Sequence, residues 1–222
     1  MKGDQLHEEQ VTLRSRDGLN LEAVLASAAP ERGRLVLCHP HPQMGGTMNA
    51  PLLKALCDGL VERGWTVLRF NFRGIGRSEG QPSLGLDEVA DAEGALDFFG
   101  AQRANSPLAI AGWSFGAAVA VRTAARNKEL AACIAIAPPI KARPGITEGV
   151  PRPVDLELKT KLLVVCADND ELVSPRDCRT WAEYVNGARF EVLAGANHLF
   201  WAKYDDLLAV IAEFLDEVVA TE

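Results

Sequence analysis

The fold is decided by the stretch Leu108-Ala109-Ile110-Ala111-Gly112-Trp113-Ser114-Phe115-Gly116-Ala117-Ala118-Val119-Ala120. Its apolar first part predicts a buried strand, and the small residues after Ser114 predict the start of a helix. Ser114 then lies at the apex of a sharp strand-to-helix turn, where we expect a strained, positive φ. The two backbones nearly touch in such a turn, so residues two positions before and after the apex must be very small, as Gly112 and Gly116 are. The helix N-terminus beneath the exposed hydroxyl favours developing negative charge, which makes Ser114 a candidate nucleophile.

Short apolar runs alternate with amphipathic segments along the rest of the chain, which favours βα units and a mostly parallel sheet. The first two strands are expected to form a hairpin around Asp17-Gly18. The predicted strands are 10–16, 19–27, 34–38, 66–70, 108–113, 132–137, 161–167 and 189–193. The predicted helices are 50–63, 87–104, 115–127, 175–185 and 204–219. We therefore predict an α/β three-layer sandwich with a mostly parallel eight-stranded sheet, in a single domain over residues 1–222, and expect ligands beyond the carboxyl ends of its strands.

A serine hydroxyl needs a neighbouring base to take its proton, and histidine is the natural base near neutral pH. The chain has four histidines. His7 lies in the polar N-terminal segment, while His39 and His41 lie in the loop after the third predicted strand. His198 follows the last predicted strand and precedes the last helix, where the base belongs if a triad runs Ser…Asp…His along the chain. We expect His198 to be the general base.

A carboxylate should hold the histidine tautomer and stabilise its charged form. It is expected just after the predicted strand 161–167, where Asp168, Asp170 and Glu171 follow one another closely. Each of the three could instead cap a turn, and at least two of them must have some such structural role. Spacing alone does not choose among them.

An acyl-transfer intermediate carries an oxyanion that needs two positioned N–H donors. One should be the backbone N–H of Phe115, directly after the candidate nucleophile. The other should come from the loop 39–47, in which two prolines cannot donate and two glycines let the backbone approach a ligand. His41, Gln43 and Met44 are the candidates, and His41 is preferred as the second residue after the strand.

Two histidines close together could also bind a metal ion. His39 and His41 point to opposite faces if the loop is extended, however, and no acidic residue stands beside them. Cys38 belongs to the apolar run of the preceding predicted strand, where a free cysteine behaves as a small buried hydrophobe. We expect no metal and no cofactor, and we expect His39 to brace the loop through hydrogen bonds.

The composition is that of a soluble globular protein, with 48% hydrophobic and 24% charged residues. The formal net charge of −7 argues against non-specific binding to nucleic acid or to an anionic membrane surface. The five cysteines contain no CxxC pair, so we expect neither a disulfide framework nor a zinc site. Neither a signal peptide nor a membrane-spanning stretch is evident, and we expect a cytoplasmic monomer or homodimer with a small-molecule substrate.

Three motifs follow one another along the chain: His39-Pro40-His41-Pro42 with Gly45-Gly46, Arg69-Phe70-Asn71-Phe72-Arg73-Gly74-Ile75-Gly76-Arg77-Ser78-Glu79-Gly80, and Gly112-Trp113-Ser114-Phe115-Gly116. Together they resemble a group of small lidless bacterial α/β-hydrolases, which includes dienelactone-hydrolase-like proteins and serine esterases, over nearly the whole chain. The resemblance implies an α/β-hydrolase fold and gives the Arg73–Ser78 turn a mainly structural role. In the wider superfamily one residue commonly separates the acid from a Leu/Ile/Val-Val-x-Pro run that follows it. Asp170 has that position before Leu172-Val173-Ser174-Pro175, so the resemblance selects Asp170.

Many α/β-hydrolases insert a helical cap between the sixth and seventh strands. The stretch available here, 138–160, is short and contains five prolines, so we expect no cap or a minimal one. An open site favours carboxylic esters with short or medium acyl chains, and a serine nucleophile, in place of the cysteine of dienelactone hydrolases proper, points to esters generally. A thioester, lactone or peptide substrate stays open, as does a hydrolase-fold binding protein with a vestigial triad.

Overall fold

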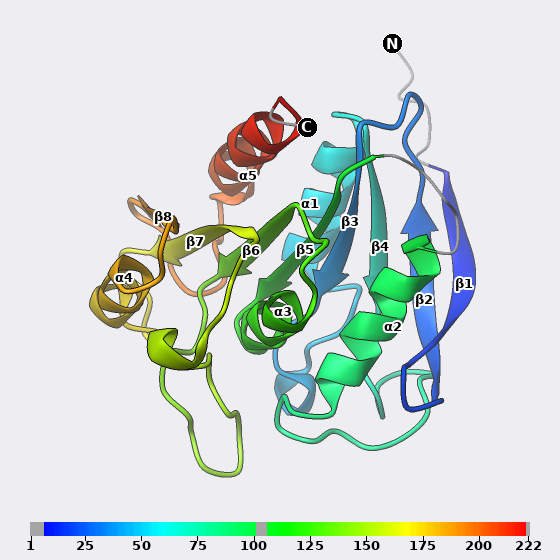
Figure 1. The fold of residues 1–222 in the computed structure, drawn as a ribbon, viewed down its shortest axis with the longest axis horizontal. Coiled ribbons are helices and arrows are strands. Elements are labelled where there is room, and N and C mark those ends of the chain that lie inside the picture. Colours follow the sequence, from blue (N-terminus) through cyan, green and yellow to red (C-terminus); the bar gives the residue numbers. More distant parts are fainter. Residues whose placement is uncertain (1–6, 101–105, 221–222) are drawn as a thin grey trace.

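Eight strands form one sheet in the computed structural model, which describes residues 7–100 and 106–220 (Figure 1). The strands are β1 (Glu8–Arg14), β2 (Asn20–Ala26), β3 (Gly33–Cys38), β4 (Trp65–Phe70), β5 (Leu108–Trp113), β6 (Ala132–Ile136), β7 (Lys161–Ala167) and β8 (Arg189–Leu193). Their order across the sheet is β1-β2-β4-β3-β5-β6-β7-β8. β1 pairs with β2 and β2 with β4 in antiparallel fashion, and all the other pairs are parallel. The predicted mostly parallel sheet is confirmed.

Helices cover both faces of this sheet, which gives the three layers expected. They are α1 (Pro51–Val61), α2 (Glu88–Gly100), α3 (Phe115–Arg126), α4 (Pro175–Glu183) and α5 (Tyr204–Val219). Side chains of α1 and α5 pack into one hydrophobic core, and those of α2, α3 and α4 pack into the other. Figure 1 shows α2 and α3 in front of the sheet and α1 behind it. Both faces of the central strands are therefore dry, and this explains why β3, β4 and β6 are buried along their whole length.

The parallel strands β3 to β8 all end at the same edge of the sheet. The loops that follow β3, β5, β7 and β8 there carry every residue proposed for catalysis. This edge is where α/β sheets bind their ligands.

Apart from α2, every helix and strand begins and ends within two residues of its predicted bounds, and two regions need comment. The first hairpin has its turn at Asp17-Gly18, but the loop is longer than a two-residue turn because the last strand pair is Arg14 with Asn20. The loop is held by its own polar groups, since the N–H of Ser15 donates to the carbonyl of Leu19 at 2.9 Å. The helix predicted over 87–104 is observed over Glu88–Gly100, and the rest of that range lies outside the described residues.

The segment between β6 and β7 contains no helical cap. Over 138–160 it forms an isolated bridge between Arg143 and Thr147 and a short 3-10 turn, η2 (Pro153–Asp155). The absence of a cap domain predicted from its length and prolines is confirmed. Among the described residues, no helix has the combined length and apolarity needed to cross a membrane.

Candidate active site

The turn between β5 and α3 has the strained geometry expected of it. Ser114 adopts φ 54° and ψ −117°, and its N–H donates to the carbonyl of Ile136 at 2.8 Å. A Cβ atom on Gly112 would lie 2.0 Å from the carbonyl oxygen of Gly116, and one on Gly116 would lie 2.4 Å from the carbonyl oxygen of Cys38. Both glycines are therefore required by the contact of backbone with backbone, and the predicted positive φ of Ser114 is confirmed.

One hydrogen-bonded chain joins the residues expected to form the triad. Nε2 of His198 lies 3.1 Å from Oγ of Ser114, and its Nδ1 lies 2.8 Å from Oδ2 of Asp170. Because a carboxylate accepts, Nδ1 carries the proton, and this leaves Nε2 of the neutral ring free to accept from the serine hydroxyl. The three groups come from the loops after β5, β7 and β8 and are brought together by the sheet.

Of the three carboxylates that follow β7, Asp170 is the one that contacts His198. Its side chain is completely buried, and its Oδ1 accepts from the N–H groups of Leu172 at 2.8 Å and Val173 at 2.7 Å. Asp168 and Glu171 are exposed, and the Asp168 carboxylate accepts from the amide of its neighbour Asn169. Both oxygens of Asp170 are thus fixed, one by the backbone and one by the imidazole.

Both expected oxyanion donors have a backbone N–H without an acceptor among the described residues. As the first residue of α3, Phe115 has no carbonyl one turn earlier in the helix to receive its N–H. The N–H of His41 has no acceptor within residues 7–100 and 106–220 either. The N–H of Met44, by contrast, donates to the carbonyl of His41 at 3.1 Å, so Met44 is a poorer candidate, and Gln43 lies in the turn η1 (Pro42–Met44) with an exposed side chain.

His39 lies in the same loop but has a different environment. It is fully buried, its Nδ1–H donates to the carbonyl of Pro40 at 2.7 Å, and its Nε2 accepts from the N–H of Phe72 at 3.1 Å. Burial lowers the pKa of His39 to about 4. Both ring nitrogens are used within the protein, so His39 braces the loop as expected.

The Ser114 hydroxyl opens into a pocket of about 250 Å³. The pocket is lined by Pro40, His41, Met44, Gly45, Gly46, Ala50, Pro51, Trp113, Ser114, Leu172, His198 and Leu199. Three of these, Met44, Leu172 and Leu199, are among the exposed large apolar side chains of the described chain. None of the described residues that line the pocket carries a carboxylate or a lysine or arginine side chain, so the pocket suits an uncharged, apolar group.

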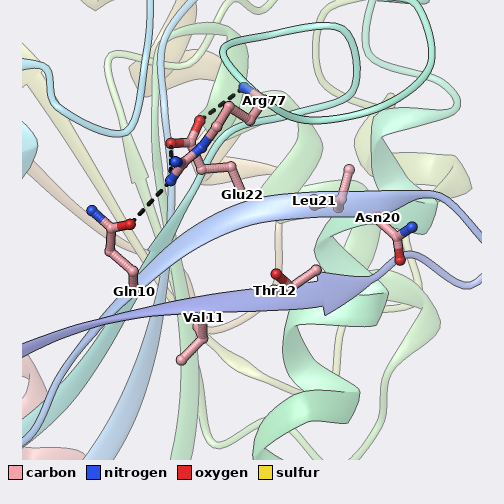
Figure 2. A pocket seen from close by; sticks show the side chains of 7 residues that line it. All are labelled: Gln10, Val11, Thr12, Asn20, Leu21, Glu22 and Arg77. Atoms are coloured by element: carbon pink, nitrogen blue, oxygen red, sulfur yellow. Dashed lines mark hydrogen bonds and ion pairs between the residues drawn. The ribbon is translucent and has the colours of Figure 1, made fainter.

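A second hollow, of about 400 Å³, lies on the β1–β2 hairpin, and neither Ser114, His198 nor Asp170 lines it (Figure 2). Figure 2 shows the Arg77 side chain extended toward Glu22 and Gln10, with which it interacts at 3.0 Å and 3.1 Å. The Glu22 carboxylate in turn accepts from the N–H of Arg77 and the side-chain amide of Asn71, both at 2.9 Å. Burial by itself would raise the pKa of Glu22, but these hydrogen bonds outweigh it and the pKa is lowered. These contacts hold the 73–78 turn against β2, which agrees with a structural role for that turn.

Among the described residues, one cluster has the spacing of metal ligands: Glu8, Cys57 and Asp58. The Glu8 carboxylate already pairs with the buried guanidinium of Arg69 at 2.5 Å, so a cation there would face a fixed positive charge. We assign no metal to it.

Two contacts of the site have no signal in the sequence. The indole N–H of Trp113 donates to the carbonyl of His198 at 3.2 Å, and thereby holds the loop that carries the base against the strand that carries the nucleophile. Nε2 of His41 lies 2.6 Å from the carbonyl oxygen of Ile146. Both pairs are far apart in the chain, and no local pattern links them.

The chain is similar to other proteins in both sequence and fold. The family model described as serine aminopeptidase, S33 matches residues 29–156. The uncharacterized protein RP471 of Rickettsia prowazekii is 30% identical over 201 residues, which cover 85% of this chain and 81% of that protein.

Two crystal structures are similar over nearly their whole length. The putative α/β-hydrolase ATU1826 of Agrobacterium tumefaciens is 29% identical, with a TM-score of 0.83, and covers 96% of this chain and 98% of its own. XC6422 of Xanthomonas campestris, described as an α/β serine hydrolase without a lid, is 28% identical with a TM-score of 0.83, and covers 96% and 97%. The chain therefore belongs to the serine aminopeptidase S33 family and is a small lidless α/β-hydrolase.

Proposed function

We propose that this protein hydrolyses carboxylic esters of small, uncharged molecules through an acyl-enzyme on Ser114. The observation that carries the proposal is the hydrogen-bonded chain Asp170–His198–Ser114, which ends in an open apolar pocket. Family membership supports a hydrolase but does not choose the bond that is cleaved.

The geometry suits nucleophilic catalysis. Nε2 of His198 takes the proton of the Ser114 hydroxyl as Oγ attacks the ester carbonyl, and the buried Asp170 carboxylate stabilises the imidazolium that forms. The N–H groups of Phe115 and His41 donate to the oxyanion of the tetrahedral intermediate. His198 then protonates the leaving alcohol, and a water molecule activated by the same histidine hydrolyses the acyl-enzyme.

The pocket supports a short or medium acyl group. Its volume of about 250 Å³ lies below the range of roughly 300–1,000 Å³ that is usual for drug-sized ligands. With no cap above the pocket, the protein offers little surface to enclose a long acyl chain.

We place the reaction in the cytoplasm, in accord with the burial of all five cysteine side chains as thiols.

The family's description favours a second candidate, the release of N-terminal residues from peptides. An aminopeptidase needs an acceptor for the substrate's ammonium group, and a carboxylate supplies the strongest one. None of the described residues lining the pocket is Asp or Glu. We therefore place esters ahead of peptides.

Labelling with a fluorophosphonate probe tests the nucleophile. The folded wild type should be labelled, and Ser114→Ala, which keeps the apolar pocket, should not. Hydrolysis of p-nitrophenyl butyrate, compared with that of an aminoacyl-p-nitroanilide, then tests the bond. An unlabelled but folded wild type would show that the triad is vestigial, and faster release from the anilide would favour the peptidase.

A further inference from the structure

The segment between β6 and β7 contacts the proposed oxyanion hole through the side chain of His41. Its Nε2 lies 2.6 Å from the carbonyl oxygen of Ile146, which is 105 positions away in the chain. A carbonyl oxygen can only accept, so Nε2 carries a proton and donates it. Within the described part of the chain, Nδ1 of the same ring is buried and has no hydrogen-bond partner. The bond to Ile146 is therefore the single polar contact that fixes the orientation of this imidazole.

The His41 ring also fixes the other proposed donor. It is more than nine-tenths buried and packs edge-on against the ring of Phe115, with 5.1 Å between the ring centroids. On its other side, the backbone of His41 is held by Gly46, whose N–H donates to the His41 carbonyl at 3.0 Å. The His41 side chain therefore belongs to one of the two proposed oxyanion donors and packs against the other.

Ile146 is a firm anchor because its segment is fastened to the body of the protein. The Arg122 guanidinium of α3 donates to the carbonyls of Glu148 at 3.2 Å and Gly149 at 2.7 Å. The N–H of Glu148 donates to the carbonyl of Leu84 at 3.1 Å. These hydrogen bonds begin only two positions after Ile146 in the chain, and they therefore restrict the movement of its carbonyl group.

We propose that the His41 side chain is a positioning residue: it anchors both oxyanion donors to the segment 138–160, which in this lidless protein supports the oxyanion hole instead of covering the pocket. The inference rests on the proposed function. Oxyanion donors act on charge that develops in the transition state, so a loose donor lowers kcat and leaves substrate binding nearly unchanged. A misplacement of about 1 Å can lower the rate by about 100-fold.

A matched pair of amide substitutions tests this role. The amide of His41→Gln can still donate to the Ile146 carbonyl, whereas that of His41→Asn is too short to reach it. We expect kcat for p-nitrophenyl butyrate to fall by roughly 30- to 100-fold in His41→Asn and His41→Ala, with KM within about threefold, and to stay within about fivefold of wild type in His41→Gln. Arg152→Gln, which removes an exposed ion pair of the same segment with Asp155, is the control and should match wild type.

A fourth substitution of His41 separates the positioning role of its side chain from hydrogen-bond donation by its backbone N–H. His41 has φ −53°, which proline can adopt, so His41→Pro removes the N–H together with the side chain. We expect kcat of His41→Pro to be lower than that of His41→Ala, roughly 1,000-fold below the wild-type value, because one of the two oxyanion donors is then missing.

Two further readouts distinguish this role from general loosening of the fold. Affinity for a trifluoromethyl ketone, which forms a tetrahedral oxyanion adduct, should weaken by the same factor as kcat. Amide hydrogen exchange in 142–150 should accelerate in His41→Asn and not in His41→Gln. A His41→Asn protein with wild-type kcat and ketone affinity would overturn the inference and leave the proposed function intact. A wild type that neither reacts with fluorophosphonate nor hydrolyses esters would overturn both.

Discussion

At the scale of the residue, the burial of a carboxylate determines what it can do for a histidine. The Asp170 side chain is fully buried, and its two oxygens are taken by backbone N–H groups and by Nδ1 of His198. Its charge therefore acts on the imidazole with little screening by water. The exposed Asp168 has no such contact.

Replacing these two aspartates by asparagine tests the assignment. In Asp170→Asn the neutral amide no longer stabilises the imidazolium or favours the correct tautomer, and we expect kcat/KM to fall roughly 1,000- to 10,000-fold. Asp168→Asn should stay within about twofold of wild type, because solvent screens its charge. Steady-state hydrolysis of p-nitrophenyl butyrate measures both. A larger loss in Asp168→Asn would reassign the acid.

His39 makes stability depend on pH. Burial lowers its pKa from 6.5 to about 4, and its Nε2 must stay unprotonated to accept from the N–H of Phe72. Between pH 6.5 and about pH 4, His39 binds more protons in the unfolded chain than in the folded one, so the free energy of unfolding decreases as the pH falls through this range. The loss assigned to His39 is about 3 kcal/mol in total and is complete below about pH 4.

Urea unfolding at pH 7, 6, 5 and 4.5 checks this prediction against His39→Gln. The other titrating groups are common to both proteins, so the difference between the two curves isolates His39. We expect the wild type to lose more stability than the variant across this range. Parallel curves would mean that His39 titrates alike in the folded and unfolded states.

At the scale of the element, the approach of α3 to the sheet depends on the absence of a side chain at Gly116. A methyl group there would lie 2.4 Å from the carbonyl of Cys38 in β3, and backbone cannot yield as a side chain can. Gly116→Ala should lower the free energy of unfolding by about 3 kcal/mol. Gly100→Ala, at the end of α2, places its added methyl more than 4 Å from every other atom counted among the described residues and should be neutral or gain up to about 1 kcal/mol. Thermal and urea unfolding of the two variants provide the comparison, and equal stabilities would contradict the packing argument.

Elements with a strong local pattern could be predicted from the sequence. The continuous apolar runs of β5 and β7 and the Gly112/Gly116 pair follow from short-range requirements, and their bounds and the strain at Ser114 match the structure. Strand order has no such pattern, because a strand buried on both faces looks alike whichever neighbour it has. β4 therefore lies between β2 and β3 without any signal in its own residues.

The candidate site shows the same limit. Ser114 and His198 could be proposed because each stands at a recognisable position after a strand. The three carboxylates after β7 could not be ranked by spacing, since the contact of Asp170 with His198 depends on how two loops 28 residues apart meet. The hydrogen bond between His41 and Ile146 joins residues 105 positions apart and depends on the path of a proline-rich segment without regular structure. Local sequence patterns could therefore not predict it.

At the scale of the whole molecule, the lack of a cap limits the substrate. The pocket is bordered by loops at the carboxyl ends of the strands. The 138–160 segment is hydrogen-bonded to α3 and contributes no residue to the lining of the pocket. Across p-nitrophenyl esters from acetate to palmitate, we expect kcat/KM to peak at a short or medium chain, since methylenes beyond the pocket stay in water and add no binding energy. An optimum at palmitate would contradict the open-site geometry.

The charge of the whole molecule adds a second limit. The chain carries a formal net charge of −7, and none of the described residues lining the pocket is a lysine or arginine that would offset it locally. A carboxylate-bearing ester should therefore have a lower kcat/KM than a neutral ester of the same size, by roughly two- to tenfold at low salt. Raising the ionic strength from 0.01 M to 1 M shortens the Debye length from about 30 Å to about 3 Å, so the gap should narrow while the neutral ester is unaffected. A gap that stays constant over this range would mean that the pocket rejects the anion by contact and not through the field of the protein.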